Sequence, residues 1–190
     1  HQGWPKFTQH LWYATPDNGI AAFSYSPSEV TAKVGNNVSV VISEDTYYPM
    51  DNRISFTIKE VKNKTKQVEF PLHLRIPKWC KRAEIIVNGK AEQYIEGGRI
   101  AVINRIWKRN DNVELHLPME VSTSTWYENA VTIERGPLVY ALKIKENWKK
   151  ENLNNSWYGP HYYQVTSSEP WNYGLVDFDR SQVNKIAQVS

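Results

Sequence analysis

The stretch Val68-Glu69-Phe70-Pro71-Leu72-His73-Leu74-Arg75-Ile76 decides the fold class of this chain. Apolar side chains alternate with other side chains from Phe70 to Ile76, and this period of two predicts a strand with one buried face and one exposed face. Pro77 follows directly and predicts the end of the strand, because proline donates no hydrogen bond to a sheet. The stretch therefore indicates a half-buried strand of an antiparallel sheet.

Strands of the same type recur on both sides of this stretch, about ten residues apart, with turn-forming residues between them. We expect strands over residues 20–25, 28–34, 37–45, 53–61, 83–87, 94–95, 99–103, 113–117 and 131–145. Asn88-Gly89 is a strong hairpin signal, and Gly136-Pro137 breaks the last run. The pattern predicts an all-β chain, an antiparallel β-sandwich of jelly-roll-like type, built as one sandwich or as two packed sandwich modules.

The two ends of the chain lack this alternation. Trp4, Phe7, Leu11 and Trp12 have helical spacing and predict a short N-terminal helix over residues 3–13, which stops at the turn formers 15–19. We therefore expect residues 1–16 to form a terminal helix and residues 17–146 the β-sandwich region. Residues 147–190 are expected to form an aromatic-rich tail of loops, including 149–152, that packs on the sandwich.

Composition excludes several functional classes. The net charge is only +3 with acidic and basic residues interspersed, which does not indicate a partner that is a nucleic acid or a membrane. No apolar stretch approaches the length of about 20 residues that a membrane span needs. The single cysteine, Cys80, rules out an intrachain disulfide and a multi-cysteine zinc site. No signal peptide is visible, and the sequence leaves a periplasmic, a secreted and a cytoplasmic location open.

Residues that could take part in catalysis or metal binding are scattered along the chain. Asp111, Glu128 and Glu134 are carboxylates of the kind that glycosidases use in pairs, but turn and strand contexts explain each of them, with a strand-end ion pair for Glu134. The histidines show no metal-binding spacing, and His73 and His116 alternate with apolar residues, so we expect them to face solvent or a neighbouring domain. Cys80 is interpreted as a packing or loop cysteine. The residue types and their spacing thus predict no catalytic residue and no metal ligand in this chain.

Aromatic residues are in excess, with 8 tryptophans, 11 tyrosines and 5 phenylalanines. Most of them are expected in the core. Those in the loop-like tail can stack on the C–H faces of a sugar, or clamp the tail against other parts of the protein. The candidates for carbohydrate binding are Trp157, Tyr158, Trp171 and Tyr173.

Several segments, taken together in their order and spacing, resemble the C-terminal part of glycoside hydrolase family 127, the β-L-arabinofuranosidases. The segments are Leu72–Cys80, Val87–Lys90, Gly98–Ile100, Ile106-Trp107, Asn110-Asp111, Leu115–Met119 and Glu134–Tyr140. The resemblance implies an (α/α)6 barrel followed by β-sandwich modules. The short N-terminal helix would then be left over from this missing upstream barrel, which is the expected partner of the chain.

The resemblance also implies a catalytic chemistry. The family that this chain resembles is understood to use a cysteine nucleophile. The nucleophile is held at a zinc site of cysteines and a glutamate, and a separate glutamate acts as general acid/base. On this resemblance the nucleophile precedes His1, and Cys80 does not match it. The zinc would belong to the parent protein, and no cofactor is expected in this chain.

The sequence therefore predicts a non-catalytic C-terminal β-sandwich region of a glycoside hydrolase acting on plant-type glycans. It would brace the barrel and wall one side of the substrate cleft. A carbohydrate-binding module remains an alternative, and a purely structural or interaction domain is another. The last predicts self-association of the chain through exposed Trp4 and Trp12.

Overall fold

A computed structural model describes residues 2–151, 159–170 and 172–174 of the chain. Two compact units are present. The first comprises His1–Glu120 with Gly136–Leu138, and the second comprises Val121–Arg135 with Val139–Ser190. The region 17–146, expected to form the sandwich, is thus distributed over both units.

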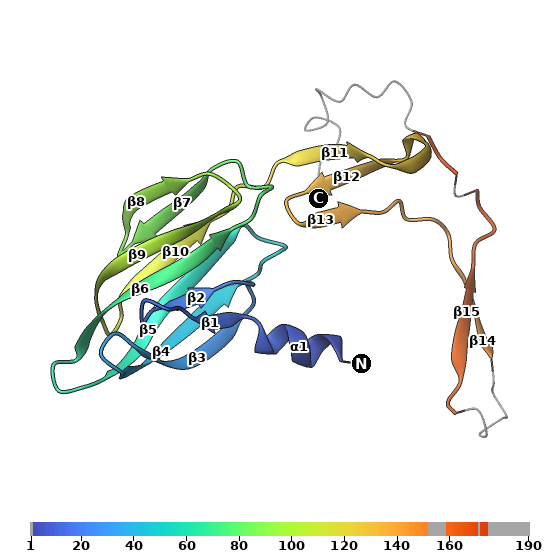
Figure 1. Cartoon of the computed structure of the whole chain (residues 1–190). Helices are drawn as coiled ribbons and strands as arrows, with labels where there is room; N and C mark the ends of the chain where they lie inside the picture. Colours follow the sequence, from blue (N-terminus) through green and yellow to red (C-terminus); the bar gives the residue numbers. More distant parts are fainter. Residues whose placement is uncertain (1, 152–158, 171, 175–190) are drawn as a thin grey trace. The chain divides into compact units, whose positions relative to one another are not determined.

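The first unit is a β-sandwich of two sheets (Figure 1). The four-stranded sheet has the order β1 (Trp12–Ala14), β2 (Ile20–Ala22), β6 (Gln67–Ile76), β9 (Arg99–Lys108). The six-stranded sheet has the order β3 (Ser28–Val34), β4 (Val38–Thr46), β5 (Arg53–Lys62), β10 (Asn112–His116), β7 (Ala83–Val87), β8 (Lys90–Ile95). The prediction of an all-β sandwich with one short helix is confirmed.

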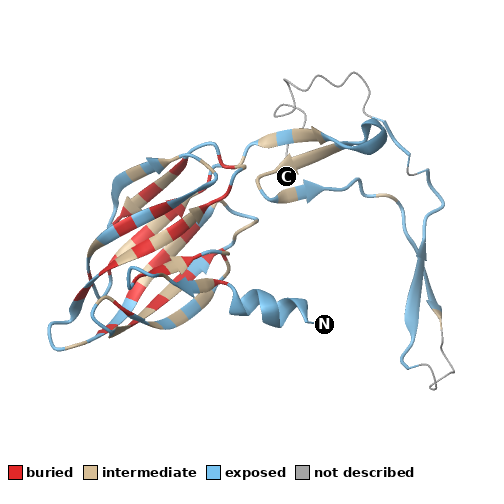
Figure 2. Cartoon of the chain, in the orientation of Figure 1, coloured by how far each residue is buried: buried red, intermediate tan, exposed pale blue. Residues whose placement is uncertain are grey.

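The core lies between these two sheets. In β6, Phe70, Leu72, Leu74 and Ile76 are all buried, as the period of two predicted. Trp107 of β9 is fully buried, and its indole Nε1 donates a hydrogen bond to the carbonyl oxygen of Phe70 at 2.9 Å. Buried residues alternate with partly exposed ones along the strands of both sheets (Figure 2). The sheets therefore share one hydrophobic core.

One strand pair departs from the expected antiparallel arrangement. β2 pairs with β6 in parallel, with Ile20 opposite Leu72. Gly19, just before β2, lies so close to β6 that a Cβ atom on it would come within 2.2 Å of the carbonyl oxygen of Pro71. A glycine is needed at this approach, which allows the β1–β2 hairpin to extend the four-stranded sheet.

The N-terminal helix is shorter than the sequence predicts. α1 covers Gly3–Gln9 and has no buried residue, whereas Trp12 and Tyr13, expected in the helix, belong to β1. A helix this short gains little stability on its own, and pairing with β2 takes up the residues that follow it. The prediction that Trp12 is exposed was also wrong: its ring meets Phe56 edge-on, with ring centroids 5.8 Å apart. Trp4 is 79% exposed, as expected.

The second unit contains two small β structures. β11 (Val121–Thr125), β12 (Val131–Arg135) and β13 (Leu138–Tyr140) form a three-stranded sheet, with the 3-10 turn η1 (Tyr127–Asn129) between β11 and β12. β14 (Asn147–Glu151) pairs with β15 (Tyr162–Thr166) as an antiparallel hairpin.

Three strand predictions in this unit were wrong. The sequence did not predict β11, because Ser and Thr alternate there with one another more than with apolar residues. Residues 141–146 are not in a strand, although the run 131–145 was predicted as one. Residues 149–151 and Tyr162–Thr166, expected in the tail of loops, lie in β14 and β15, where cross-strand pairing overrides the local sequence.

Within the described parts of the chain, no helix has the length and apolar character that crossing a membrane requires.

Candidate functional site

Only one of the four residues predicted to bind carbohydrate can be placed. Tyr173 is 58% exposed, and with Ile133, Tyr140 and Leu142 it lines a hollow of about 330 Å³ in the second unit, named here the Tyr173 hollow. Trp157, Tyr158 and Trp171 lie outside the described residues. The structure therefore brings a second tyrosine, Tyr140, to Tyr173, and this partner was not predicted.

The Tyr173 hollow has a lining suited to the C–H face of a sugar ring. Tyrosine rings offer a flat apolar surface together with a hydroxyl group that forms hydrogen bonds. The volume lies at the lower end of the range for small-molecule sites, roughly 300–1,000 Å³, which matches one sugar unit better than an oligosaccharide. Stacking of a single sugar is the chemistry that this geometry can support.

A second apolar surface lies on the outer face of the four-stranded sheet. On β9, three apolar side chains point away from the core and stay largely exposed: Ile100 at 54%, Val102 at 43% and Ile106 at 56%. The exposed Asn104 lies between the last two on the same face. Tyr13 of β1 and Phe23 add exposed aromatic rings, which meet edge-on with centroids 5.6 Å apart. These five apolar residues are called the apolar face.

Two polar residues beside the apolar face, Arg75 and His73, interact with neighbouring groups. The Nε of Arg75 donates a hydrogen bond to the carbonyl oxygen of Phe23 at 2.6 Å, and its guanidinium lies 5.3 Å from the centre of the Phe23 ring. His73 pairs through Nε2 with Asp17 at 2.9 Å. His73 is thus only partly exposed, and it stands opposite Val102 on β9. The aliphatic and aromatic side chains of the apolar face, together with Arg75 beside it, have the composition of a protein contact surface.

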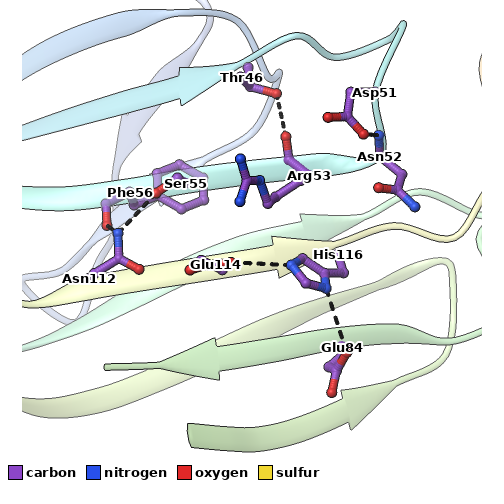
Figure 3. Close-up of polar contacts among 10 residues, drawn as sticks. All are labelled: Thr46, Asp51, Asn52, Arg53, Ser55, Phe56, Glu84, Asn112, Glu114 and His116. Atoms are coloured by element: carbon purple, nitrogen blue, oxygen red, sulfur yellow. Dashed lines mark hydrogen bonds and ion pairs between the residues drawn. The ribbon is translucent and has the colours of Figure 1, made fainter. Parts of the chain in front are cut away.

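The outer face of the six-stranded sheet has a different chemistry (Figure 3). His116 of β10 lies between two carboxylates, with Nδ1 3.6 Å from Glu84 on β7 and Nε2 3.3 Å from Glu114 on its own strand. Asn112, also on β10, donates hydrogen bonds to the Ser55 hydroxyl at 2.9 Å and to the Phe56 carbonyl oxygen at 3.2 Å. The side chains of His116 and both glutamates are about 30% exposed, as expected for a histidine facing solvent or another domain.

These contacts stabilise the pairing of β5, β10 and β7. Each joins residues on neighbouring strands, or residues two apart on one strand, as cross-strand pairs of a solvated sheet face commonly do. No three histidine, cysteine, aspartate or glutamate side chains in the described ranges are grouped so that they could hold a metal ion.

The carboxylates considered for catalysis have structural contacts. Asp111 is buried and accepts hydrogen bonds from the Lys108 backbone N–H at 2.9 Å and from the Asn88 side chain at 3.0 Å, which holds two turns together. Glu134 accepts a hydrogen bond from the Ser124 hydroxyl at 2.6 Å. Among the described residues it forms no ion pair, in contrast to the strand-end ion pair that the sequence suggested. A general acid or base must reach a substrate, and both carboxylates are already engaged within the fold.

Cys80 is completely buried in the core of the first unit. Burial raises the pKa of its thiol, which opposes formation of a thiolate. The zinc site implied by the family needs several cysteines and a glutamate, and this chain contains one cysteine. The residues of this chain therefore do not fit such a site.

Glu44 is a buried carboxylate that was not predicted from the sequence. It lies in β4, where inward-facing Val40 and Ile42 precede it with a period of two. Its oxygens accept hydrogen bonds from the Ser26 backbone N–H at 3.0 Å and from the Ser28 hydroxyl at 3.2 Å. The alternation Val40, Ile42, Glu44 was the signal that placed this acid on the core face.

The model of one protein family matches residues 19–119, and its description is β-L-arabinofuranosidase, GH127 middle domain. This match ends close to Glu120, the last residue of the long continuous segment of the first unit. No curated protein sequence matches the chain significantly.

Solved structures resemble the chain over most of its length. A GH127 β-L-arabinofuranosidase from Geobacillus stearothermophilus T6 is 25% identical with a TM-score of 0.61, and the alignment covers 90% of this chain and 30% of that one. A glycoside hydrolase is 26% identical with a TM-score of 0.61, over 87% and 31%. A GH127 β-arabinofuranosidase, 18% identical with a TM-score of 0.62 over 87% and 31%, supports the fold alone. The chain spans about 30% of the length of these proteins.

Proposed function

Because the chain belongs to glycoside hydrolase family 127, whose middle domain it contains, we propose that it is a non-catalytic β-sandwich region of a larger hydrolase acting on plant-type glycans. Its role would be to brace the catalytic part of that protein. The observation that carries this proposal is the apolar face, a sheet surface whose largest side chains are exposed in the chain by itself.

We assign the apolar face to contact with a helical domain of the same polypeptide. β1, which carries Tyr13, follows α1 directly, and the exposed rings of Trp4 and Phe7 on α1 pack edge-on against each other. An aromatic helix and an apolar sheet face therefore adjoin in sequence. Burying the three β9 side chains would contribute about 1.5–3 kcal/mol for each of them that becomes fully covered.

Thiol labelling tests the contact. Val102→Cys places a thiol on the apolar face, and the native Cys80 is buried and reacts slowly. We expect iodoacetamide to label the new thiol rapidly in the 190-residue chain and slowly in the full-length protein that contains this sequence, as read by peptide mass spectrometry. Thr31→Cys, on an exposed position of the edge strand β3, is the matched control and should react equally in both. Equal labelling of Val102→Cys in both proteins would contradict the proposal that this chain braces another domain.

A hydrolysis assay tests the non-catalytic role. The chain by itself should release no p-nitrophenol from p-nitrophenyl β-L-arabinofuranoside, since Asp111 and Glu134 are engaged in the fold and Cys80 is buried. Turnover by the purified chain that is lost in a Glu134→Gln variant would show that a catalytic group had been assigned a structural role.

Carbohydrate binding is a second candidate function, and the Tyr173 hollow favours it. We expect Tyr173→Ala to weaken binding of L-arabinose or arabinan to the chain, because it removes the stacking surface. Tyr163→Ala is the control, since Tyr163 is an exposed tyrosine of β15. Titration calorimetry that detects no binding, or binding that Tyr173→Ala leaves intact, would exclude this hollow as the sugar site.

A further inference from the structure

An exposed tryptophan, Trp126, directly follows the first strand of the three-stranded sheet in the second unit (Figure 1). Its side chain is 65% exposed, and no aromatic ring or cation of the described residues packs on its indole. Exposure alone assigns it no role, because single apolar side chains are common on protein surfaces. The contacts that hold the ring in place are more informative.

Both the backbone and the side chain of Trp126 are anchored. Its backbone N–H donates a hydrogen bond to the Ala130 carbonyl oxygen at 2.8 Å, across a turn in which Glu128 and Asn129 have φ values of +54° and +61°. Its indole Nε1 donates a hydrogen bond to the Ser124 hydroxyl at 2.8 Å. The ring is therefore positioned before any ligand arrives, which lowers the entropy cost of binding.

Ser124 connects the indole to a carboxylate. Its hydroxyl accepts the hydrogen bond from Trp126 and donates one to Oε1 of Glu134 at 2.6 Å. The edge of the indole and the carboxylate thus lie within hydrogen-bond reach of the same oxygen atom. Hydrogen bonds in such a chain polarise one another, so the contact also fixes Glu134 beside the ring.

Two hydrogen-bonding groups next to this chain of contacts are unused. The second carboxylate oxygen of Glu134 is accessible and has no partner among the described residues. Ser122 is exposed and lies directly opposite Glu134 in the β11–β12 pair, and its hydroxyl has no partner within the described part of the chain. The residues Trp126, Ser122, Ser124 and Glu134 are together called the Trp126 platform.

The Trp126 platform is separate from the surfaces discussed above. Successive residues of a strand point to opposite faces of a sheet, and Ile133, next to Glu134 on β12, lines the Tyr173 hollow. The platform and the hollow therefore lie on opposite faces of the three-stranded sheet. The apolar face belongs to the first unit, and the platform belongs to the second.

The chemistry of the platform matches a neutral sugar. The C–H face of a sugar ring packs on an indole, and sugar hydroxyls can donate to a carboxylate and exchange hydrogen bonds with a serine. β11 and β12, which are described throughout, carry no lysine or arginine on this face, and the charge of Glu134 opposes phosphates and uronates. Serine and glutamate are depleted at protein interfaces, so a protein partner matches less well.

We propose that the Trp126 platform binds one unit of a neutral glycan. The indole stacks on the sugar ring, the free oxygen of Glu134 accepts a hydrogen bond from one hydroxyl, and Ser122 binds a neighbouring hydroxyl. Ser124 is a positioning residue, which holds the indole and the carboxylate without contacting the sugar. Accepting a hydrogen bond involves no proton transfer, so this role of Glu134 agrees with a non-catalytic chain.

The test is titration of the 15N-labelled 190-residue chain with arabinotriose and xylotriose, followed by 1H–15N NMR spectra. The signals to follow are the Trp126 indole Nε1–H, identified by its absence from Trp126→Phe, and the backbone amides of β11 and β12. We expect these signals to shift saturably, with millimolar affinity. Trp126→Ala should weaken the binding reported by the β11 and β12 amides at least tenfold.

Trp148→Ala is the matched control. Trp148 of β14 is 62% exposed, and its indole also donates to the side chain two residues earlier, that of Glu146, at 2.8 Å. Its removal should leave binding at the platform unchanged, and so should Tyr173→Ala. Trigalacturonate, an acidic trisaccharide, should bind the platform more weakly than either neutral sugar.

Two variants of Ser124 test the positioning role. Ser124→Ala removes the acceptor of the indole and the donor to Glu134, so it should weaken binding several-fold. Ser124→Thr keeps the hydroxyl and should retain the affinity of the parent chain, and thermal unfolding of both variants shows whether the sheet itself is intact. Equal affinities of an intact Ser124→Ala variant and the parent chain would contradict this role.

The proposal is overturned if neither neutral sugar moves the Trp126 signal, whatever happens at the Tyr173 hollow. Binding that survives Trp126→Ala, or tighter binding of trigalacturonate, would also overturn it. Self-association of the chain that Trp126→Ala abolishes, without any response to sugar, would assign the ring to a protein contact instead.

Discussion

Glu44 lies directly opposite Ser28 in the β3–β4 pair, and its carboxylate accepts a hydrogen bond from the Ser28 hydroxyl at 3.2 Å. Trp12 Nε1 donates to the same hydroxyl at 3.0 Å, so the three residues connect β1, β3 and β4. No ion pair reaches Glu44 within the described chain. Burial is the largest effect on this carboxyl and raises its pKa to about 8.

The raised pKa of Glu44 predicts a stability that falls as the pH rises. The folded protein binds this proton more tightly than the unfolded chain, whose carboxyl has a pKa of 4.5. The stabilising contribution is therefore complete below about pH 4.5 and is lost towards pH 8, by up to about 1.4 kcal/mol for each pH unit. The side chain in Glu44→Gln stays neutral at every pH. The free energy of unfolding of this variant should therefore increase relative to that of the parent chain from pH 5 to pH 8, as measured by urea denaturation.

Asp45→Asn is the matched control for this experiment. Asp45 is the next residue of β4 and is exposed on the outer face. Its variant should follow the pH dependence of the parent chain. A constant difference between Glu44→Gln and the parent chain from pH 5 to pH 8 would mean that Glu44 is ionised in the folded protein.

Gly35 and Gly89 both have a positive φ, so comparing their alanine variants distinguishes backbone strain from steric clash. Only at Gly35 would an added Cβ atom come within 2.5 Å of a backbone oxygen, that of Glu69. Gly89→Ala should cost about 1–2 kcal/mol, the strain of a left-handed residue. Gly35→Ala should cost at least about 1 kcal/mol more, because the turn must move off β6. Equal free energies of unfolding for the two variants would contradict the close approach.

Trp107 should be the tryptophan on which folding depends most. It is fully buried against Phe70, and its indole is hydrogen-bonded. Trp107→Ala should lower the free energy of unfolding by about 3–5 kcal/mol. Trp4→Ala, at an exposed helix position, should change it by no more than about 0.5 kcal/mol. If Trp107→Ala does not fold, Trp107→Phe should still show a clear loss in denaturant midpoint, and an unchanged midpoint would refute the packing.

The Cys80 thiol should not react with alkylating reagents in the folded chain. Its side chain is buried, and burial raises the pKa of the thiol, so the reactive thiolate is scarce. Iodoacetamide at pH 8 should leave it unmodified for as long as the protein stays folded, and should modify it fully in 8 M urea. Rapid modification of the native chain would show that the turn after Pro77 opens.

Much of the sandwich could be predicted from the sequence because its information is local. The alternation through Phe70, Leu72 and Leu74 is visible in adjacent residues, and every one of these side chains is buried. Asn88-Gly89 forms the predicted hairpin turn, with positive φ at both residues. The sequence did not predict β11 or β14, whose polar residues become strands only through pairing with β12 and β15.

The candidate sites could be predicted only in part. Tyr173 was singled out from its loop-like surroundings, but its neighbour Tyr140 comes from a segment more than thirty positions earlier in the printed sequence. The apolar face escaped detection because Ile100, Val102 and Ile106 form an ordinary alternating pattern, and a single strand does not tell which of its faces is covered.

The sequence by itself determined most strands and turns of the sandwich and most of its core, since hydrophobic periodicity and turn chemistry act between neighbouring residues. The tertiary structure decided which distant residues meet: Glu44 with Ser28, Asp17 with His73, and Tyr140 with Tyr173 in one hollow. Those meetings depend on strand register and sheet order, which follow from packing of the whole core and are not encoded in any short segment.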